Sequence, residues 1–428
     1  MKKTIIVREY ARLTTDCVEA TLDQASITST AFDWLCNLAA GFHSSGASLL
    51  QVENRRWLRL DNFVGVVETP CGTVLEILPK HSIDNSENIA IASRKLLVKM
   101  LEVALDLPVR TTDKTNINTF KHPLLEWVMK QFVLTLDHLV KRGLRFDYKR
   151  VEEEQRYLKG QLDINKQMRQ QPGRAHIFNI RHDLFLPDRP ENRLLKTALM
   201  RICSTTKQQD TWRLSHELAG LLAEIPHSQD IRSDFNQWGN DRLMAHYKSV
   251  QPWCELVLGQ HMPLAIRGST HGISLLFPME KLFERYVEVQ LRKQLLVHYT
   301  LKPQARSKFL CIYNENNIFQ LRPDLLIQNS KRENIHVLDT KWKILSNNKT
   351  ENKYGLSQGD FYQLFAYGQN YLNGKGEMLL IYPHTNDFPN LIHSFNFTPD
   401  LKLWVTSFDL ENDLLVLSDH IHFKTCLL

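Results

Sequence analysis

The spacing of apolar residues changes twice along this chain, and that change constrains the fold more than any other feature of the sequence. Up to about residue 80, apolar residues form short runs broken by turn residues, namely 4–7, 57–60, 63–67 and 73–78. Short, punctuated runs of this kind are typical of β-strands. We therefore expect a β-rich N-terminal domain over residues 1–85.

From about residue 88 the apolar residues follow a helical period. One stripe runs from Leu96 to Leu105 and a second runs from Leu125 to Leu139, before Gly143. Stripes with three- and four-residue spacing predict amphipathic helices. Further helices are expected over about 191–202 and 212–225, whereas 146–185 is polar and is predicted to be irregular. We expect a mainly helical middle region over residues 86–245.

A third pattern begins near residue 273. A helix is predicted from Glu280 to about Val297, followed by β-type segments at 308–313, 318–328, 335–344 and 377–382. A predicted helix over about 360–372 separates the last two segments, and such a crossover implies that they run parallel. The sequence thus predicts an α/β domain with a mixed sheet flanked by helices over residues 246–428.

Composition sets the class of protein. The chain has 428 residues, 43% hydrophobic and 23% charged, with a formal net charge of +6. These values are ordinary for a soluble globular protein, and the mild positive charge permits binding to a polyanion without requiring it. The seven cysteines form no metal-binding spacing, and no apolar run approaches a membrane span. We expect a cytoplasmic protein.

Two short motifs near the C-terminus indicate chemistry. Pro323–Asp324 precedes an apolar run, and Asp339-Thr340-Lys341 ends the next one, with a polar turn at 329–334 between them. Alternate residues of a strand share a face, so Asp339 and Lys341 point the same way. A hairpin can bring Asp324 next to Asp339. Two adjacent carboxylates repel each other unless a cation lies between them.

This arrangement predicts a Mg²⁺ site at Asp324 and Asp339. Mg²⁺ prefers oxygen ligands, keeps several waters and takes the remaining ligands from phosphate. A bound metal lowers the pKa of water and polarises a phosphodiester, and Lys341 can orient that water or stabilise developing charge. The alternative is structural, because a single Asp-x-Lys on a strand is usually a solvated face or a surface ion pair.

These motifs resemble those of the PD-(D/E)XK nuclease superfamily. The helix at 360–372 contains Gln363 and Tyr367 on one face and is similar to the QxxxY helix of some branches. The resemblance implies that these two residues touch DNA or support the site; the alternative is a core tyrosine and a loop-capping glutamine. It also implies a Glu on the preceding helix, for which Glu284 is the candidate and Glu280 and Glu288 are competitors.

More of the chain resembles one family of that superfamily, McrC, the nuclease subunit of modified-cytosine restriction systems. The resemblance lies in segments 63–66, 75–80, 157–163 and 190–196 and in the stretch from Pro278 to Glu284. These segments occur in the family's order over most of residues 60–385. Gln161 departs from the pattern, where a basic residue is expected after Gly160.

The resemblance implies a division of labour. A partner AAA+ GTPase of the McrB type would recognise double-stranded DNA bearing modified cytosine, and the N-terminal domain of this chain would dock into the partner ring and stimulate nucleotide hydrolysis. The chain contains no GxxxxGK[ST] loop, so it cannot be the motor. Cutting both strands needs two active sites, which predicts dimerisation of complexes on DNA.

Three functions remain open from the sequence. The first is a Mg²⁺-dependent endonuclease subunit, the second is a non-catalytic adaptor or activator of the ring, and the third is a stand-alone DNA repair nuclease. Basic residues in the middle region could contact phosphates or an acidic surface of the ring, or simply face solvent; they are Arg145, Lys149, Arg150, Lys166, Arg169 and Arg174.

Overall fold

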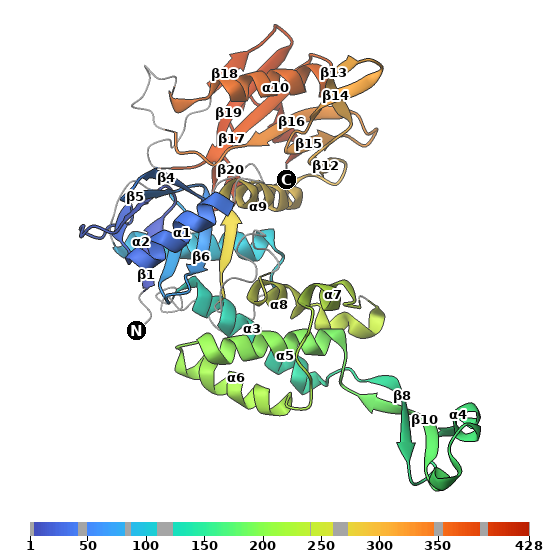
Figure 1. Ribbon diagram of the computed structural model, residues 1–428. Helices are drawn as coiled ribbons and strands as arrows, with labels where there is room; N and C mark the ends of the chain where they lie inside the picture. Colours follow the sequence, from blue (N-terminus) through green and yellow to red (C-terminus); the bar gives the residue numbers. More distant parts are fainter. Residues whose placement is uncertain are drawn as a thin grey trace. The chain divides into compact units, whose positions relative to one another are not determined.

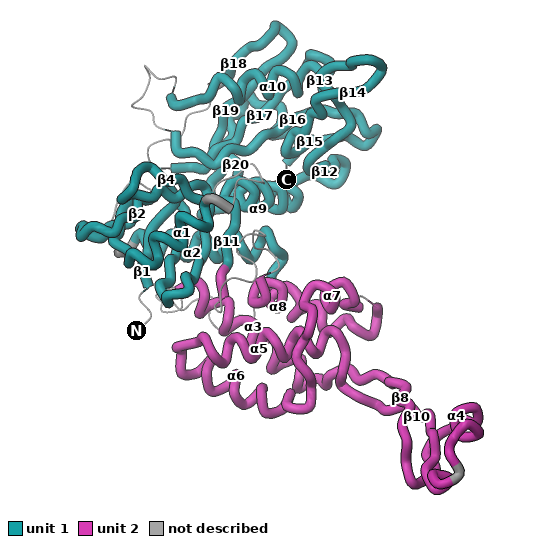
Figure 2. Tube along the Cα trace, viewed as in Figure 1, with its two compact units in different colours: residues 1–107, 262–270, 275–428 teal, residues 108–261, 271–274 magenta. Residues whose placement is uncertain are grey.

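The computed structural model describes residues 4–41, 49–81, 87–108, 123–239, 241–259, 273–345, 354–385 and 393–427. The chain forms two compact units (Figures 1 and 2). Unit 1 contains residues 1–107, 262–270 and 275–428, and unit 2 contains 108–261 and 271–274. Both outer parts of the sequence therefore fall in unit 1, and the division into 1–85, 86–245 and 246–428 stays a prediction.

The N-terminal part of unit 1 contains two small sheets, as its short apolar runs predicted. The first sheet has the order β1-β7-β6-β11, with strands Thr4–Arg8, Val74–Leu78, Phe63–Glu68 and Leu275–Pro278. The second has the order β3-β2-β5-β4, with strands Gln24–Ser26, Arg12–Thr14, Trp57–Leu60 and Leu50–Asn54. A helix that the sequence analysis missed, α1 (Ser29–Gly41), packs into the same core, where Ala31, Phe32 and Leu35 are buried.

Strand β11 joins this N-terminal sheet to the C-terminal part of the chain. It pairs with β6, where Leu276 lies opposite Gly65. Gly65 has a φ of 126°, and a Cβ at this position would lie 2.0 Å from the carbonyl oxygen of Leu275. Only glycine permits this close approach. The pairing places the entry to helix α9 (Met279–Gln294) at the edge of the N-terminal sheet.

A seven-stranded mixed sheet forms the C-terminal part of unit 1. Its order is β12-β15-β16-β17-β19-β18, with β20 paired to β19. The strands are Thr300–Pro303, Leu325–Gln328, Asn334–Thr340, Gly376–Pro383, Leu401–Asp409, His393–Asn396 and Leu414–Leu415. Strands β16 and β17 run parallel across helix α10 (Gln358–Tyr371), which confirms the predicted crossover.

Three expectations for this part are corrected. The predicted strand over 318–328 is two strands, β14 (Asn316–Leu321) and β15, because the chain breaks at Pro323. Strand β16 ends at Thr340 instead of residue 344. Helix α9 ends at Gln294, three residues before the predicted end. Strand β14 pairs with β13 (Lys308–Tyr313) in a separate two-stranded ribbon.

Both faces of the large sheet are buried, which explains its nearly continuous apolar strands. One face packs against α10, and this cluster includes Val337, Leu364, Met378 and Leu380. Helix α9 packs against β12 and β16 and also against α2 (Glu87–Ala104). Between α2 and the C-terminal part, Lys99 Nζ lies 2.8 Å from Asp413 Oδ1.

Unit 2 is mainly helical, as predicted for the middle region. Its longer helices are α3 (Leu124–Arg142), α5 (Pro190–Thr205) and α6 (Gln209–Leu221). Two shorter ones are α7 (Ile231–Asn236) and α8 (Gln251–Val257). Helix α3 ends before Gly143, whose φ is 98°, with Lys141 and Arg142 in its last turn. Glycine in this conformation and basic residues in the last turn are common helix ends.

The prediction of an irregular segment over 146–185 is wrong. Strands β8 (Asp147–Gln155) and β10 (Phe178–Leu186) pair antiparallel over nine residues each and extend from the helices of unit 2 as an arm, residues 147–186 (Figure 1). The arm also contains β9 (Gln161–Leu162) and α4 (Ile164–Met168). Strand β8 is charged and mostly exposed, so it lacks the alternation by which half-buried strands are recognised. Strand β10 does alternate, with Phe178, Ile180, Leu184 and Leu186 at alternate positions, and this signal was missed.

The α/β class predicted from the sequence is confirmed, with mixed sheets and flanking helices. Within the described residues, no helix is long and apolar enough to span a membrane.

Candidate active site

The two aspartates predicted at hairpin distance lie opposite each other. Leu325 of β15 pairs with Leu338 of β16 in antiparallel register, so Asp324 and Asp339 occupy the next pair of positions. Asp324 Oδ2 accepts hydrogen bonds from the backbone N of Thr340 at 2.8 Å and from its Oγ1 at 2.9 Å. Thr340 therefore fixes one oxygen of Asp324 on the hairpin, and the other, Oδ1, accepts a long hydrogen bond from Gln304 Nε2 at 3.4 Å.

Asp339 is almost completely buried, with 1% of its surface exposed. Lys341 Nζ lies 2.6 Å from Asp339 Oδ2, so the two side chains share a face as predicted. Asp339 Oδ1 has no hydrogen-bond partner within the described residues. Buried carboxylate oxygens are normally satisfied, so an unpartnered one marks a place where a ligand can bind.

The electrostatics of the pair reflect burial and mutual repulsion. Burial and the neighbouring Asp324 raise the pKa of Asp339 to about 7, against the opposing effect of Lys341. Burial also raises the pKa of Asp324, although its hydrogen bonds from Thr340 favour the charged form. For Lys341, burial is outweighed by Asp339, and its pKa is raised. The pair therefore favours an additional positive charge, supplied by protons or by a cation.

Glu284 lies beside this pair on helix α9. Gln304 Nε2 donates to Glu284 Oε1 at 2.5 Å and lies 3.4 Å from Asp324 Oδ1. Burial and the charge of Asp324 raise the pKa of Glu284 to about 7. Its competitor Glu288 is engaged elsewhere, because its two oxygens accept from Arg285 and Arg292. The geometry thus favours Glu284 over Glu288 as the acidic residue of this helix.

Helix α10 holds the backbone that leads into Asp324. Tyr367 donates to the carbonyl oxygen of Arg322 at 2.9 Å, and Gln363 Nε2 donates to the Tyr367 hydroxyl at 2.7 Å. Tyr371 donates to the carbonyl oxygen of Leu321 at 2.9 Å. Tyr367 is 4% exposed, so it is a core residue, and its hydroxyl anchors the strand immediately before Pro323.

Three residues of the site were not predicted. Thr340 was expected to point away, yet its hydroxyl binds Asp324. Gln304 comes from the end of β12, where it adopts a φ of 46°, and no sequence signal identifies it. Asp360, at the start of α10, contributes to the raised pKa of both Asp339 and Lys341. Its position three residues before Gln363 was the only available signal.

The family of the chain follows from a match over most of its length. A family model described as the McrBC 5-methylcytosine restriction system component matches residues 58–383, more than half of the chain. This chain belongs to the McrBC family. The resemblance to McrC drawn from the sequence motifs is thereby confirmed, and the match includes Glu284, Asp324, Asp339 and Lys341.

Solved structures with McrB and McrC share the fold. The chain is similar to one in a half-complex from a tetradecameric assembly of Thermococcus gammatolerans McrB AAA+ hexamers with bound McrC, with a TM-score of 0.70, 18% identity and 95% of each chain covered. A second match, in the Thermococcus gammatolerans McrBC complex, has a TM-score of 0.51 and 20% identity, and covers 68% of this chain and 87% of the other. No curated protein matches the chain.

The donor set of this McrBC-family chain fits Mg²⁺. Asp324 and Asp339 offer oxygen ligands, and Oδ1 of Asp339, unpartnered among the described residues, is available to a cation. Within the described ranges there is no cluster of three or more His, Cys, Asp or Glu at metal-binding spacing. A site with two carboxylates suits a metal that keeps several waters, and it does not suit a fully protein-coordinated ion.

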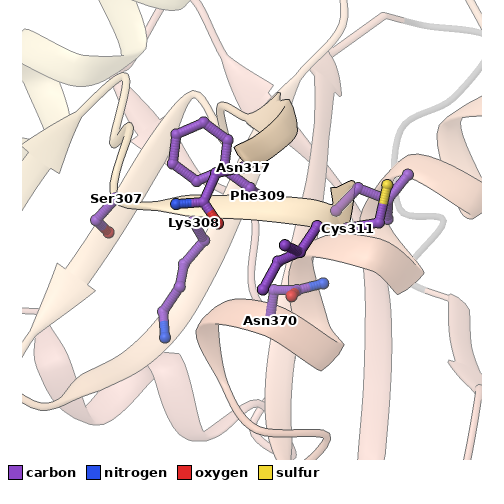
Figure 3. A pocket seen from close by; sticks show the side chains of 8 residues that line it. Ser307, Lys308, Phe309, Cys311, Asn317 and Asn370 are labelled. Atoms are coloured by element: carbon purple, nitrogen blue, oxygen red, sulfur yellow. The ribbon is translucent and has the colours of Figure 1, made fainter. Parts of the chain in front are cut away.

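A groove of about 520 Å³ lies elsewhere on the same part of the chain. It is lined mainly by the β13–β14 ribbon and by Asn370 of α10 (Figure 3). None of Glu284, Asp324, Asp339 or Lys341 lines it. The groove is therefore distinct from the carboxylate site.

Proposed function

We propose that this chain is the McrC-type nuclease subunit of a modification-dependent restriction complex and hydrolyses DNA phosphodiesters with Mg²⁺. The observation that carries this proposal is the buried Asp339 between the half-buried Asp324 and Lys341, with one oxygen of Asp339 lacking a partner among the described residues. A purely structural ion pair would satisfy both oxygens of so deeply buried a carboxylate.

The residues divide the work by position. Asp324 and Asp339 would hold Mg²⁺, which when bound acidifies water and polarises the phosphate. Lys341 is held at 2.6 Å from Asp339, where its ammonium can orient the attacking water or stabilise charge on the phosphate. Glu284, with a pKa of about 7, can accept a proton from that water. Gln363 and Tyr367 support the site by fixing the backbone before Asp324.

We further propose an AAA+ GTPase partner of the McrB type. The solved relatives contain McrB AAA+ hexamers with bound McrC, and this chain has no GxxxxGK[ST] loop of its own. The partner would recognise modified cytosine in double-stranded DNA, and docking of this chain would stimulate its nucleotide hydrolysis. Two complexes would meet on DNA to cut both strands, in the cytoplasm.

The alternatives differ in measurable ways. A non-catalytic adaptor would assemble with the ring and stimulate nucleotide hydrolysis without any role for Asp339. A stand-alone repair nuclease would cut DNA strongly without partner or nucleotide. The buried Asp339, with one oxygen unpartnered among the described residues, favours a catalytic protein over an adaptor, because an adaptor gains nothing from burying this charge.

The decisive experiment compares Asp339→Ala with a surface control, Asp400→Ala. Asp400 is exposed, its one ion pair within the described ranges is with Lys375, and it belongs to the same unit. Each full-length variant is combined with the McrB-type partner, GTP, Mg²⁺ and DNA containing 5-methylcytosine. We expect Asp339→Ala to lower cleavage by about 10³-fold, with partner assembly and GTP hydrolysis unchanged. Asp400→Ala should cleave at the wild-type rate.

Cleavage that survives Asp339→Ala at the level of the control would reject this site. Strong cleavage by the wild-type chain alone would favour the repair nuclease.

A further inference from the structure

A buried glutamate of the N-terminal sheet reaches the segment that contains Lys341. Glu9 directly follows β1 and has no exposed surface. Its Oε1 accepts two hydrogen bonds, from the backbone N of Lys80 at 2.7 Å and from Nε1 of Trp342 at 2.7 Å. Its Oε2 has no hydrogen-bond partner in the described part of the chain. Glu9 and Trp342 are 333 residues apart in sequence, so only the fold of unit 1 brings them together.

Lys341 lies between two anchors. Strand β16 ends at Thr340, and the backbone N of Lys341 still donates to the carbonyl oxygen of Ile381 at 2.9 Å. The chain then leaves the sheet, and the next side chain, Trp342, is 7% exposed. Its ring packs against Phe283 of α9 with centroids 5.3 Å apart, and its N–H binds Glu9.

The direction of Trp342 bears on the direction of Lys341. The chain turns at Trp342, where the backbone N of Lys343 donates to the carbonyl oxygen of Lys341 at 3.1 Å. Holding the Trp342 ring against the N-terminal sheet therefore also holds the adjoining backbone of Lys341, whose Nζ lies 2.6 Å from Asp339 Oδ2. The hydrogen bond is favoured, since a buried indole N–H without an acceptor loses its hydrogen bond to water and gains none in return. Packing against Phe283 alone would leave the ring free to tilt.

We propose that Glu9 is a positioning residue of the nuclease site, which fixes Lys341 beside Asp339 by accepting the indole N–H of Trp342. This inference rests on the proposed function. It implies that the N-terminal sheet is part of the catalytic apparatus. The same sheet holds the start of α9, because the backbone N of Met279 donates to the carbonyl oxygen of Asn62 at 3.0 Å. The N-terminal sheet thus holds both the helix that carries Glu284 and the segment that carries Lys341.

The role requires an acceptor oxygen more than a charge. Burial raises the pKa of Glu9 to about 8, so its neutral form is populated near neutral pH. Glutamine keeps the shape and one acceptor oxygen, whereas leucine keeps the approximate volume and removes both. Glu9→Gln is therefore the conservative variant, and Glu9→Leu removes the interaction.

The test uses Trp342→Phe, which removes the indole N–H, with Trp404→Phe as a matched control. Trp404 is a buried tryptophan on β19 of the seven-stranded sheet, and its Nε1 has no hydrogen-bond partner among the described residues. Cleavage of DNA containing 5-methylcytosine is measured for the full-length chain with the McrB-type partner, GTP and Mg²⁺. DNA affinity and GTP hydrolysis are measured in the same preparations.

We expect Trp342→Phe and Glu9→Leu each to lower kcat by about tenfold or more, with KM and GTP hydrolysis unchanged, because small misplacement of a catalytic group has large effects. The double variant should be no slower than either single one. Glu9→Gln should restore most of the rate, and Trp404→Phe should match the wild type.

Two results would overturn the inference: a kcat for Trp342→Phe within twofold of the Trp404→Phe control, or multiplying losses in the double variant. Trp342→Phe keeps the test valid if Glu9→Leu fails to fold. Asp339→Ala is assayed in parallel. If Asp339→Ala abolishes cleavage while Trp342→Phe matches its control, the nuclease function stands and only the positioning role of Glu9 falls.

Discussion

Two regions of the molecule are rich in charge, and they handle it differently. On the arm of unit 2, exposed acids and bases satisfy each other, as Arg174 with Glu154 at 2.6 Å and Lys166 with Glu152 at 2.5 Å. At the end of β16, Asp339 is buried beside Asp324 and keeps one oxygen without a partner among the described residues. Paired surface charges need no further ligand, whereas the unpartnered oxygen of Asp339 can take a proton or a cation.

The titration of the two regions points the same way. On the arm, the pKa of Glu152 is lowered, first by its hydrogen bond from Lys166, and the pKa of Asp163 is lowered by the backbone N of the same residue. At the site, burial raises the pKa of Asp324, Asp339 and Glu284. Raised carboxylate pKa values in a cluster are typical of functional sites, and lowered ones of surface ion pairs.

The largest effect that separates the two regions is expected at Lys341. Lys341→Met removes the ammonium beside Asp339 and should lower kcat by about 10²–10³-fold, because the charge acts where the phosphate reacts. The matched change on the arm, Lys149→Met, removes a cation that is 62% exposed and paired with Asp188. Single-turnover cleavage measures both. Comparable losses in the two variants would remove the distinction between site and arm.

The pH dependence of cleavage should report the buried carboxylates. Asp339 and Glu284 each have a pKa of about 7 without metal, and both must ionise to work. Because two groups must lose a proton, the rate at low Mg²⁺ concentration should fall by up to about a hundredfold per pH unit well below 7, and more Mg²⁺ should move this limb to lower pH, because metal competes with protons. A rate that stays constant from pH 5.5 to 8 at low Mg²⁺ would contradict this.

A smaller effect is expected from the helix that supports the site. Tyr367→Phe removes the hydrogen bond to the carbonyl oxygen of Arg322 and should slow cleavage by about three- to tenfold, with about 1 kcal/mol less stability. Tyr362→Phe is the control, since Tyr362 lies on the same helix, is 66% exposed and bonds only to Gln358 among the described residues. Equal cleavage rates for the two variants would show that Tyr367 is only a core residue and that its hydroxyl does not support the site.

The smallest effects concern the free energy of unfolding in the absence of metal. The pKa of Asp339 is raised in the folded state, so its ionisation lowers stability increasingly from about pH 4 to about 7 and constantly above. Asp339→Asn should therefore raise stability at pH 8 by about 1–3 kcal/mol, with little change at pH 4. In this variant Lys341 loses its ion pair with Asp339. The resulting loss of stability is limited, because Lys341 is 26% exposed and Asp324 remains near it.

On the arm, Arg150→Ala removes an exposed pair with Asp183 and should change stability by roughly 0–1 kcal/mol at either pH. Urea denaturation at pH 4 and pH 8 measures both variants. A loss of stability at pH 8 for Asp339→Asn would show that the buried carboxylate is a structural ion pair.

Much of the site could be predicted because the positions of its residues follow from strand alternation and from the pairing of a hairpin. Alternation placed Asp339 and Lys341 on one face, and the polar turn at 329–334 predicted the hairpin that brings Asp324 opposite Asp339. Helix α10 was predicted from its position between two apolar strands. These signals depend on residues close together in sequence, so they can be recognised without knowing the rest of the fold.

The rest depends on contacts over long distances in sequence. Glu9 lies 333 residues from Trp342, and Gln304 reaches Glu284 and Asp324 from a separate strand. The arm was missed for another reason, because β8 is charged and mostly exposed, and the alternating apolar residues of β10 were not recognised beside it. The exposed bases predicted to contact phosphates include Lys149, Arg150, Lys166 and Arg174, and each is paired with an acid of its own unit.

The central claim is that Asp324 and Asp339 together hold a divalent metal ion. Crystals of the full-length chain soaked in Mn²⁺ test it directly, because Mn²⁺ replaces Mg²⁺ at oxygen sites and gives an anomalous signal. The account predicts an anomalous peak about 2.0–2.3 Å from Asp339 Oδ1 and from an oxygen of Asp324, absent in Asp339→Ala. No peak at this position, with Lys341 still bound to Asp339, would contradict it.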